Sequence, residues 1–241
     1  MTTVGLVYPD HAAEDDYPPV AAALGVRLPV AHIYGTDLHA VPELLDLGSP
    51  ARLRAGAELL APHRPDAVVW ACTSGSFVYG PDGAREQARG LAEAAGVPAT
   101  STSIAFTDAA RALGLRRVAV AASYPDDVAR LFVDFLAAAG IEVTSMTSAG
   151  IDTAAEVGTL TPDRVLTLAA DNDHADAEAL LIPDTAMHTM ALLPELERAL
   201  AKPVLTANQV TVWAGLRLAG AVPVAPALGT LFAGRPSDVR R

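Results

Sequence analysis

The sequence predicts an α/β protein built from two similar three-layer α/β/α halves with parallel sheets. Three observations indicate this fold: short apolar runs alternate with helix-like segments, glycines follow those segments, and several motifs occur twice in the same order. The 241 residues suffice for one large or two small domains, and an apolar content of 51% is enough for a full core.

The expected strands are short runs rich in Val, Leu, Ile and Ala. The runs are continuous rather than alternating, which is typical of strands that are buried on both faces of a parallel sheet. They occupy residues 4–8, 66–72, 117–123, 141–146, 178–183 and 203–207.

The segments between these runs are rich in Ala, Leu, Arg and Glu, and they predict helices. The helices are expected at residues 50–63, 83–96, 107–114, 126–140 and 192–201. Gly96, Gly114 and Gly140 end three of them, as expected for the residue just past a helix C-terminus. A strand that alternates with a helix predicts stacked βαβ units.

Three motifs occur twice with similar spacing. Tyr-Pro-Asp ends a strand at Tyr8 and again at Tyr124, and 64–75 is echoed by 174–186, which pairs Cys72 with Asp184. Residues 96–114 are echoed by 201–220. The repeat predicts a first half of residues 1–104, completed by 208–241, and a second half of residues 105–207.

Ligands of parallel α/β sheets bind beyond the carboxyl ends of the strands. If two Rossmann-like halves face each other, those ends share one cleft. We therefore expect the active site in the cleft between the halves, where Cys72 and Asp184 approach one ligand from opposite sides.

Composition excludes several functions. The net charge of −11 argues against nucleic acid as a partner, because a nucleic-acid binder needs a basic surface. No apolar run reaches the roughly 18 residues of a membrane span. The first residues lack a basic group ahead of the apolar run, unlike a secretory signal. The sequence has no Cys/His spacing typical of a zinc site. Because a single cysteine cannot form an internal disulfide, we expect a cytoplasmic protein.

Four segments of the chain resemble the aspartate/glutamate racemase superfamily, and within it the maleate isomerase and arylmalonate decarboxylase branch. The segments are ACTSGSF (71–77), LGLRRVAVAASYPDDV (113–128), EVG (156–158) and the whole of 181–220. The resemblance implies two pseudosymmetric domains around a buried cleft, no metal and no organic cofactor. It also implies chemistry at a carbon next to a carboxylate.

The candidate catalytic pair matches neither pattern of that branch. In its racemases and maleate isomerases each half supplies a cysteine, and here Cys72 is the first while Asp184 replaces the second. The arylmalonate decarboxylases keep the second cysteine and have glycine at the first position. Where maleate isomerases present asparagines, this chain has His11 after the first strand, and Ala154 and Ala155 before EVG.

The CTSGS segment is typical of an anion site, because consecutive N–H groups, hydroxyls and a flexible glycine surround the strand end. We expect Thr73 and Ser74 to donate to a substrate carboxylate. The resemblance adds the Tyr124 phenol and the Thr185 N–H as donors. Such a dioxyanion hole stabilises an enediolate. The remaining candidate substrate-binding residues are Tyr8, His11 and Asn208.

Cys72 is the expected nucleophile or base, and Asp184 is the expected acid or base on the other face. A nearby helix N-terminus should lower the pKa of the thiol from about 8.5. Structural roles remain open: Cys72 as a buried apolar residue, Asp184 or Asn208 as a helix cap, and Tyr124 as a core residue.

The sequence predicts a cofactor-independent isomerase or racemase that acts on a small carboxylic or dicarboxylic acid. A malonate-type decarboxylase is the alternative, and a non-catalytic carboxylate-binding protein is a third hypothesis. The expected partner is a small carboxylate substrate, with no nucleic acid, no membrane, and a homo-oligomer left open.

Overall fold

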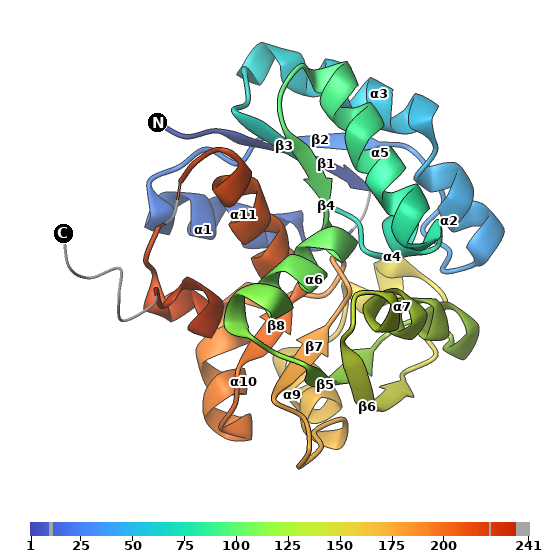
Figure 1. Cartoon of the computed structure of the whole chain (residues 1–241), viewed down its shortest axis with the longest axis vertical. Coiled ribbons are helices and arrows are strands. Elements are labelled where there is room, and N and C mark those ends of the chain that lie inside the picture. Colours follow the sequence, from blue (N-terminus) through green and yellow to red (C-terminus); the bar gives the residue numbers. More distant parts are fainter. Residues whose placement is uncertain (10–11, 222, 235–241) are drawn as a thin grey trace.

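The strands of the described residues form two parallel sheets with the same strand order, β2–β1–β3–β4 and β6–β5–β7–β8. The computed structural model describes residues 1–9, 12–221 and 223–234, and Figure 1 shows the first sheet above the second. This shared topology confirms the predicted pair of similar α/β halves. The strands are β1 Val4–Pro9, β2 Val30–Ile33, β3 Ala67–Trp70, β4 Ala99–Ser101, β5 Arg117–Ala122, β6 Glu142–Ser148, β7 Ala179–Ile182 and β8 Val204–Thr206.

Helices cover both faces of the first sheet. Gly56 of α3 lies against Val7, whereas Gly215 of α11 lies against Val4, and these two valines point to opposite faces of β1. A Cβ atom at Gly215 would come within 2.4 Å of Val4 Cγ1, so glycine lets this helix approach the sheet closely. The helices are α1 Tyr17–Leu24, α2 Val41–Leu47, α3 Pro50–Leu60, α4 Ser74–Phe77, α5 Gly80–Ala95, α6 Thr102–Leu113, α7 Asp126–Ala138, α8 Ala154–Val157, α9 Pro162–Asp171, α10 Leu193–Leu200 and α11 Ala207–Leu218.

Local sequence signals explain where several helices begin and end. The Ser101 side chain accepts a hydrogen bond from Ile104 N, and this cap starts α6 five residues earlier than the run at 107–114 predicts. Gly96 and Gly114 follow α5 and α6 with φ angles of 70° and 74°. This left-handed conformation favours glycine, and it confirms the expected helix ends.

The sequence missed two strands and several helices. In β2, buried and half-buried residues alternate, so this edge strand lacks a continuous apolar run, and β4 is only three residues long. β6 is a half-exposed edge strand rather than a strand buried on both faces. The helices α1, α2 and α9 fall outside the predicted segments, although Thr161 caps α9 and Pro162 begins it.

Aromatic side chains of α4, α6 and α7 pack together beside the Cys72 loop. Phe132 of α7 lies with its ring centre 5.5 Å from that of Phe77 in α4 and 5.4 Å from that of Phe106 in α6. The helix α11 contacts β1, β3 and β4 as well as β8. The division into 1–104 with 208–241 and 105–207 stays a prediction, and α6 spans the position at which the halves would divide.

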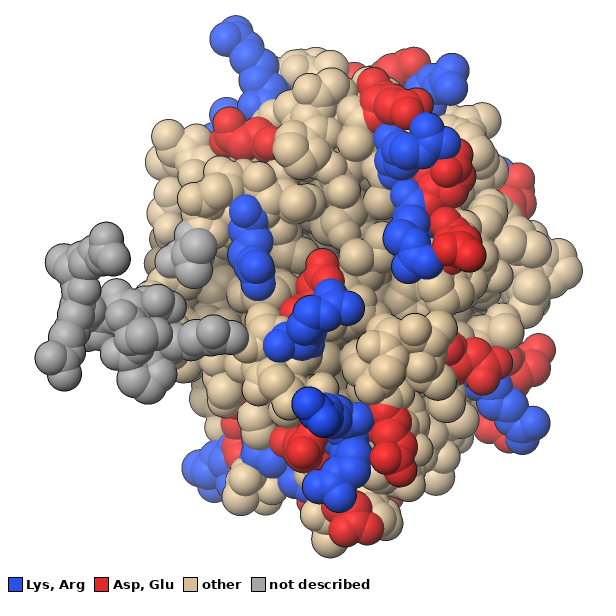
Figure 2. All heavy atoms as spheres, in the orientation of Figure 1, with Lys and Arg blue, Asp and Glu red and all other residues tan. Residues whose placement is uncertain are grey.

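Acidic and basic side chains are intermixed on the face shown in Figure 2. On α5, Arg85 pairs with Asp82, and Arg89 pairs with Glu86 and Glu93. The basic groups of this helix are therefore matched by acids next to them. Within the described ranges, no helix has the length and apolar character needed to cross a membrane.

Candidate active site

Cys72 lies two residues beyond the end of β3, where the chain turns into the short helix α4. Its side chain is buried, with 4% of its surface exposed. The Gly75 N–H donates to Sγ at 3.3 Å, and Ser74 Oγ lies 3.8 Å from the sulfur. A Cβ atom at Gly75 would come within 2.9 Å of the Trp70 ring and 3.2 Å of Sγ, so glycine allows this approach.

The Cys72 thiol is protonated at neutral pH in this structure. Burial raises its pKa from 9.0 to about 12, more than the Gly75 N–H and Ser74 lower it, and the charge of Asp184 raises it further. The expectation of a lowered pKa is therefore wrong, because desolvation of the thiolate outweighs the nearby N–H groups. The resting site holds a proton donor on sulfur.

Asp184 lies two residues beyond β7, the position that corresponds to Cys72 in the second half. Its side chain is buried, with 3% of its surface exposed. The Ala186 N–H donates to Oδ1 at 2.9 Å, and the Ser123 hydroxyl donates to Oδ2. The carboxylate closes a turn rather than capping a helix, since the next helical residues begin at Met190.

Replacing Ser123 with alanine should lower kcat about tenfold and the free energy of unfolding by about 1–3 kcal/mol, because the buried Asp184 oxygen loses a donor. Initial rates and urea unfolding measure the two effects. Thr107→Val is the control, since its buried hydroxyl donates to Ile104 O within α6. Equal losses of kcat in both variants would refute a positioning role for Ser123.

One cavity of about 30 Å³ lies between the halves, and both Cys72 and Asp184 line it. Cys72 and Ser74 line it from the first half, and Asp184 and Thr185 line it from the second. The other lining residues are Pro9, Thr36, Asp37, His39, Leu44, Leu47, Ala154 and Ala186. This volume is close to that of one water molecule.

Two buried tyrosines, Tyr8 near the end of β1 and Tyr124 two residues after β5, bind the residues that follow β7 but are not among the residues that line the cavity. The Tyr124 phenol donates to Pro183 O, and the Tyr8 phenol donates to Thr185 O at 2.7 Å and accepts from Ala13 N at 3.0 Å. Burial raises the pKa of both phenols well above 10, and the charge of Asp184 raises them further. Both phenols therefore remain protonated donors, but each now binds a backbone carbonyl. Tyr124 can reach a substrate carboxylate only by exchanging that bond.

The hydroxyls of Thr73 and Ser74 lie beside the Tyr124 phenol. Thr73 Oγ1 is buried, and it forms no hydrogen bond of good geometry with any residue that the structure describes. A buried hydroxyl without a hydrogen-bond partner lowers the stability of the protein, and an incoming acceptor can restore that stability. The Thr73 hydroxyl is thus available to an acceptor, and its role as a donor to a substrate carboxylate stays a prediction.

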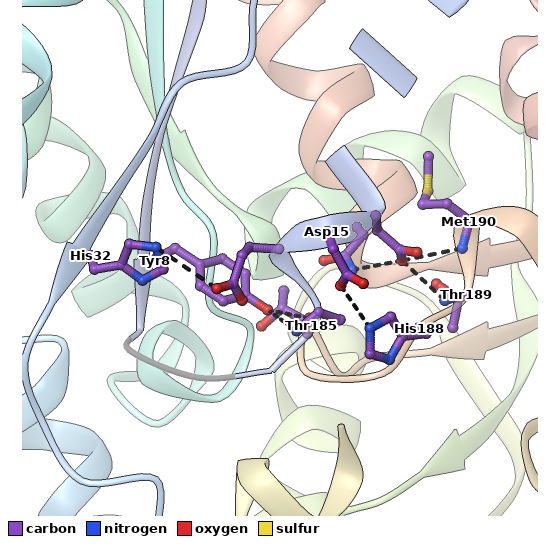
Figure 3. Close-up of polar contacts among 11 residues, drawn as sticks. Tyr8, Asp15, His32, Thr185, His188, Thr189 and Met190 are labelled. Atoms are coloured by element: carbon purple, nitrogen blue, oxygen red, sulfur yellow. Dashed lines mark hydrogen bonds and ion pairs between the residues drawn. The ribbon is translucent and has the colours of Figure 1, made fainter. Parts of the chain in front are cut away.

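The residues after β1 are bound to those after β7, and Figure 3 shows these contacts. His188 Nε2 lies 2.7 Å from Asp15 Oδ1, while Asp16 Oδ2 accepts from Thr189 N at 3.1 Å and Met190 N at 3.3 Å. Asn208 donates to the same Asp16 oxygen and accepts from Tyr17. Asn208 therefore supports this contact between the halves and does not line the described cavity. His11 lies outside the described residues.

Asp16 should make stability depend on pH. Burial raises its pKa above 3.8, although hydrogen bonds from Thr189, Asn208 and Met190 oppose this. The folded chain binds this proton more tightly than the unfolded chain, so the contribution of Asp16 is fully present below about pH 3.8 and is lost as the pH rises through the raised pKa. We therefore expect the free energy of unfolding of Asp16→Asn, relative to that of wild type, to rise as the pH increases from about 3.8 through the raised pKa of Asp16.

Urea unfolding at a series of pH values measures this difference. Asp82→Asn is the control, because the Asp82 side chain is fully exposed on α5. A stability difference between Asp16→Asn and wild type that stays constant from pH 3 upward would show that Asp16 titrates alike in both states.

Sequence reasoning missed His39, which lies in the segment between β2 and α2 and lines the cavity. Its side chain is 6% exposed, and Nδ1 lies 3.0 Å from Ile151 O. No motif or repeat marks this position. His39 could have been found only from the three-dimensional fold, which brings the segment between β2 and α2 to the same cavity as Cys72.

The chain is similar to known enzymes over most of its length. The arylmalonate decarboxylase family model matches residues 48–232. The Bordetella bronchiseptica arylmalonate decarboxylase is 36% identical over 59% of this chain, and the match spans 60% of that enzyme. The Geobacillus stearothermophilus maleate isomerase is 27% identical over 87% of this chain and 82% of its own length.

A solved structure of Nocardia farcinica maleate cis-trans isomerase, a Cys→Ser mutant with a covalently bound succinylcysteine intermediate, has the same fold. It superposes with a TM-score of 0.86 and 22% identity, and the match covers 96% of this chain and 98% of that one. These matches confirm the resemblance to the maleate isomerase and arylmalonate decarboxylase branch of the aspartate/glutamate racemase superfamily. The chain belongs to the arylmalonate decarboxylase family.

Proposed function

We propose that this chain is a cofactor-independent isomerase that acts on a small carboxylic or dicarboxylic acid, in the manner of a maleate cis-trans isomerase. One observation carries the proposal: a single cavity is lined by a protonated thiol from one half and a carboxylate from the other. A thiol and a carboxylate on opposed walls are an acid and a base of the kind that proton transfer or thiol addition requires.

Cis–trans isomerisation would proceed through a cysteine adduct. Sγ of Cys72 bonds to one alkene carbon, its proton passes to Asp184, and the π pair moves into the carboxylate of the other alkene carbon as an enediolate. The former double bond is now single and rotates. The C–S bond then breaks, the double bond re-forms, and Asp184 returns the proton to sulfur. Covalent succinylcysteine in the Nocardia isomerase supports a thiol adduct in a protein of this fold.

The enediolate carries extra negative charge that the cavity must stabilise. Ser74 and Thr185 line the cavity, and Thr73, next to both Cys72 and Ser74 in the chain, has a buried hydroxyl without a hydrogen-bond partner. We propose that these groups and the Tyr124 phenol form the dioxyanion hole. Loss of one preorganised donor of this kind lowers kcat by about 10²–10³.

Decarboxylation of a malonate-type acid is the second candidate function. The family match and the 36% identity to the Bordetella decarboxylase favour it. In that reaction CO₂ leaves first, and the enediolate then takes a proton from the Cys72 thiol or from Asp184. A non-catalytic carboxylate-binding protein is the third hypothesis, and it predicts binding without any product.

Proton NMR in D₂O separates these functions. Wild-type protein is incubated with maleate, a phenylmalonate and a panel of small hydroxy and amino acids. Isomerisation gives fumarate from maleate, racemisation gives deuterium at the α-carbon, and decarboxylation gives an arylacetate. A chain that leaves every acid unchanged while binding one by calorimetry would contradict the proposed isomerase. The cytoplasm as compartment, a homo-oligomer and the lack of a nucleic-acid partner stay predictions.

A further inference from the structure

His39 is the one basic side chain in the described cavity lining. The described lining contains no lysine or arginine, whereas Asp37 and Asp184 are both acidic. A dicarboxylate would add two negative charges to this buried site. The neutral donors around Cys72 and Tyr124 serve one carboxylate, so the second needs another partner.

The hydrogen bonds of His39 fix the protonation of its ring. The Ile151 carbonyl can only accept, so Nδ1 carries a proton in their 3.0 Å contact. In the neutral ring Nε2 then holds the lone pair, and it has no partner among the described residues. The backbone N–H of His39 also donates to Asp152 O at 2.7 Å. The imidazole ring packs edge-on against the Tyr124 ring, with 4.9 Å between the ring centres. The ring is therefore held in place, and Nε2 remains able to bind a ligand.

We propose that His39 is a specificity-determining residue that takes up a proton and binds the second carboxylate of a dicarboxylate substrate through Nε2. This inference rests on the proposed function of the site, and it selects dicarboxylic over monocarboxylic acids. Three titratable groups line the same cavity as the ring, namely Asp37 from its own segment, Cys72 after β3 and Asp184 after β7. Tyr124 after β5 contacts the ring, and Asp152 after β6 accepts from the backbone N–H of His39. A proton on Nε2 makes His39 a charged donor, which an anionic acceptor binds more strongly than a neutral one.

Two substitutions separate this role from a structural one. In His39→Asn the amide nitrogen occupies the place of Nδ1 and can keep the bond to Ile151, but no group reaches the position of Nε2. In His39→Gln the amide nitrogen reaches the position of Nε2 without a charge. A residue that only holds its segment in place would tolerate asparagine better than glutamine, and a residue that binds substrate would show the reverse order.

The experiment is calorimetric titration with succinate and with butyrate, which share four carbons but differ by one carboxylate and cannot undergo cis–trans isomerisation. We expect His39→Asn to weaken succinate binding at least about tenfold and to leave butyrate binding within about twofold, with His39→Gln in between. Repeating the succinate titration in buffers of different ionisation enthalpy should show proton uptake with wild type and none with either variant.

The inference is overturned if wild type binds succinate no more tightly than butyrate, or if His39→Asn changes both affinities alike. Loss of the proposed isomerase activity in the NMR assay leaves these binding results intact, so the two claims fail separately. A wild type that isomerises maleate without preferring succinate to butyrate rejects His39 alone.

Discussion

Cys72→Ser is expected to lower kcat for isomerisation by at least about a thousandfold. The adduct mechanism requires Sγ to bond to carbon, and a serine hydroxyl is a much weaker nucleophile that Asp184 cannot activate to the same extent. Proton NMR of maleate with wild type and variant measures the change. Serine is slightly smaller than cysteine, so the buried position should accept it without loss of the fold.

Succinate binding and thermal unfolding of Cys72→Ser provide the control. Both should stay close to wild type, because the Gly75 N–H can still donate to the new oxygen. Undiminished isomerisation by this folded variant would exclude a cysteine adduct. If Cys72→Ser still forms an arylacetate, the result favours the decarboxylase alternative, because Asp184 can then protonate the enediolate.

Asp184→Asn is expected to lower kcat by about 10²–10⁴, the usual contribution of a general acid–base group. The amide can still accept from Ser123 or Ala186, but it cannot take the thiol proton. Only the ionised fraction of Cys72 would then react. Because the pKa of Cys72 is about 12, the residual rate should rise with pH through the neutral range, whereas the wild-type rate should vary less.

The same variant should also lower the pKa of Cys72, since the charge of Asp184 raises it. One cysteine gives one ¹³Cβ resonance in a selectively labelled chain, so NMR reads its titration directly. Asp37→Asn is the matched control: it removes a second carboxylate of the cavity lining that is not among the causes of the thiol shift. Equal shifts in the two variants would show that Asp184 has no special relation to the sulfur.

The central strands were predictable because burial on both faces leaves a continuous apolar run, as in β3 and β7. The edge strand β2 carries half-buried residues at every second position, and nothing in four such residues separates a strand from a loop. The internal repeat was more informative than any single motif. It aligned Cys72 with Asp184, and the two lie at the same offset beyond β3 and β7.

Contacts between segments far apart in sequence were not predictable. Ser123 and Asp184, or His39 and Ile151, meet only because two strand ends and two loops converge. The prediction of a lowered pKa for Cys72 was wrong for a related reason. A helix N-terminus can be recognised in a sequence, but complete burial of the thiol depends on how the two halves close over it.

The central claim is that Cys72 and Asp184 act as one proton-sharing pair across the cavity, and a double-variant cycle tests it most directly. The measured quantity is kcat/KM for maleate in wild type, Cys72→Ser, Asp184→Asn and the combined variant. Residues that act as a unit give losses that do not add. We predict that the combined variant is no slower than the slower single variant. Losses that multiply would contradict the account, because they would mean that the thiol and the carboxylate work independently.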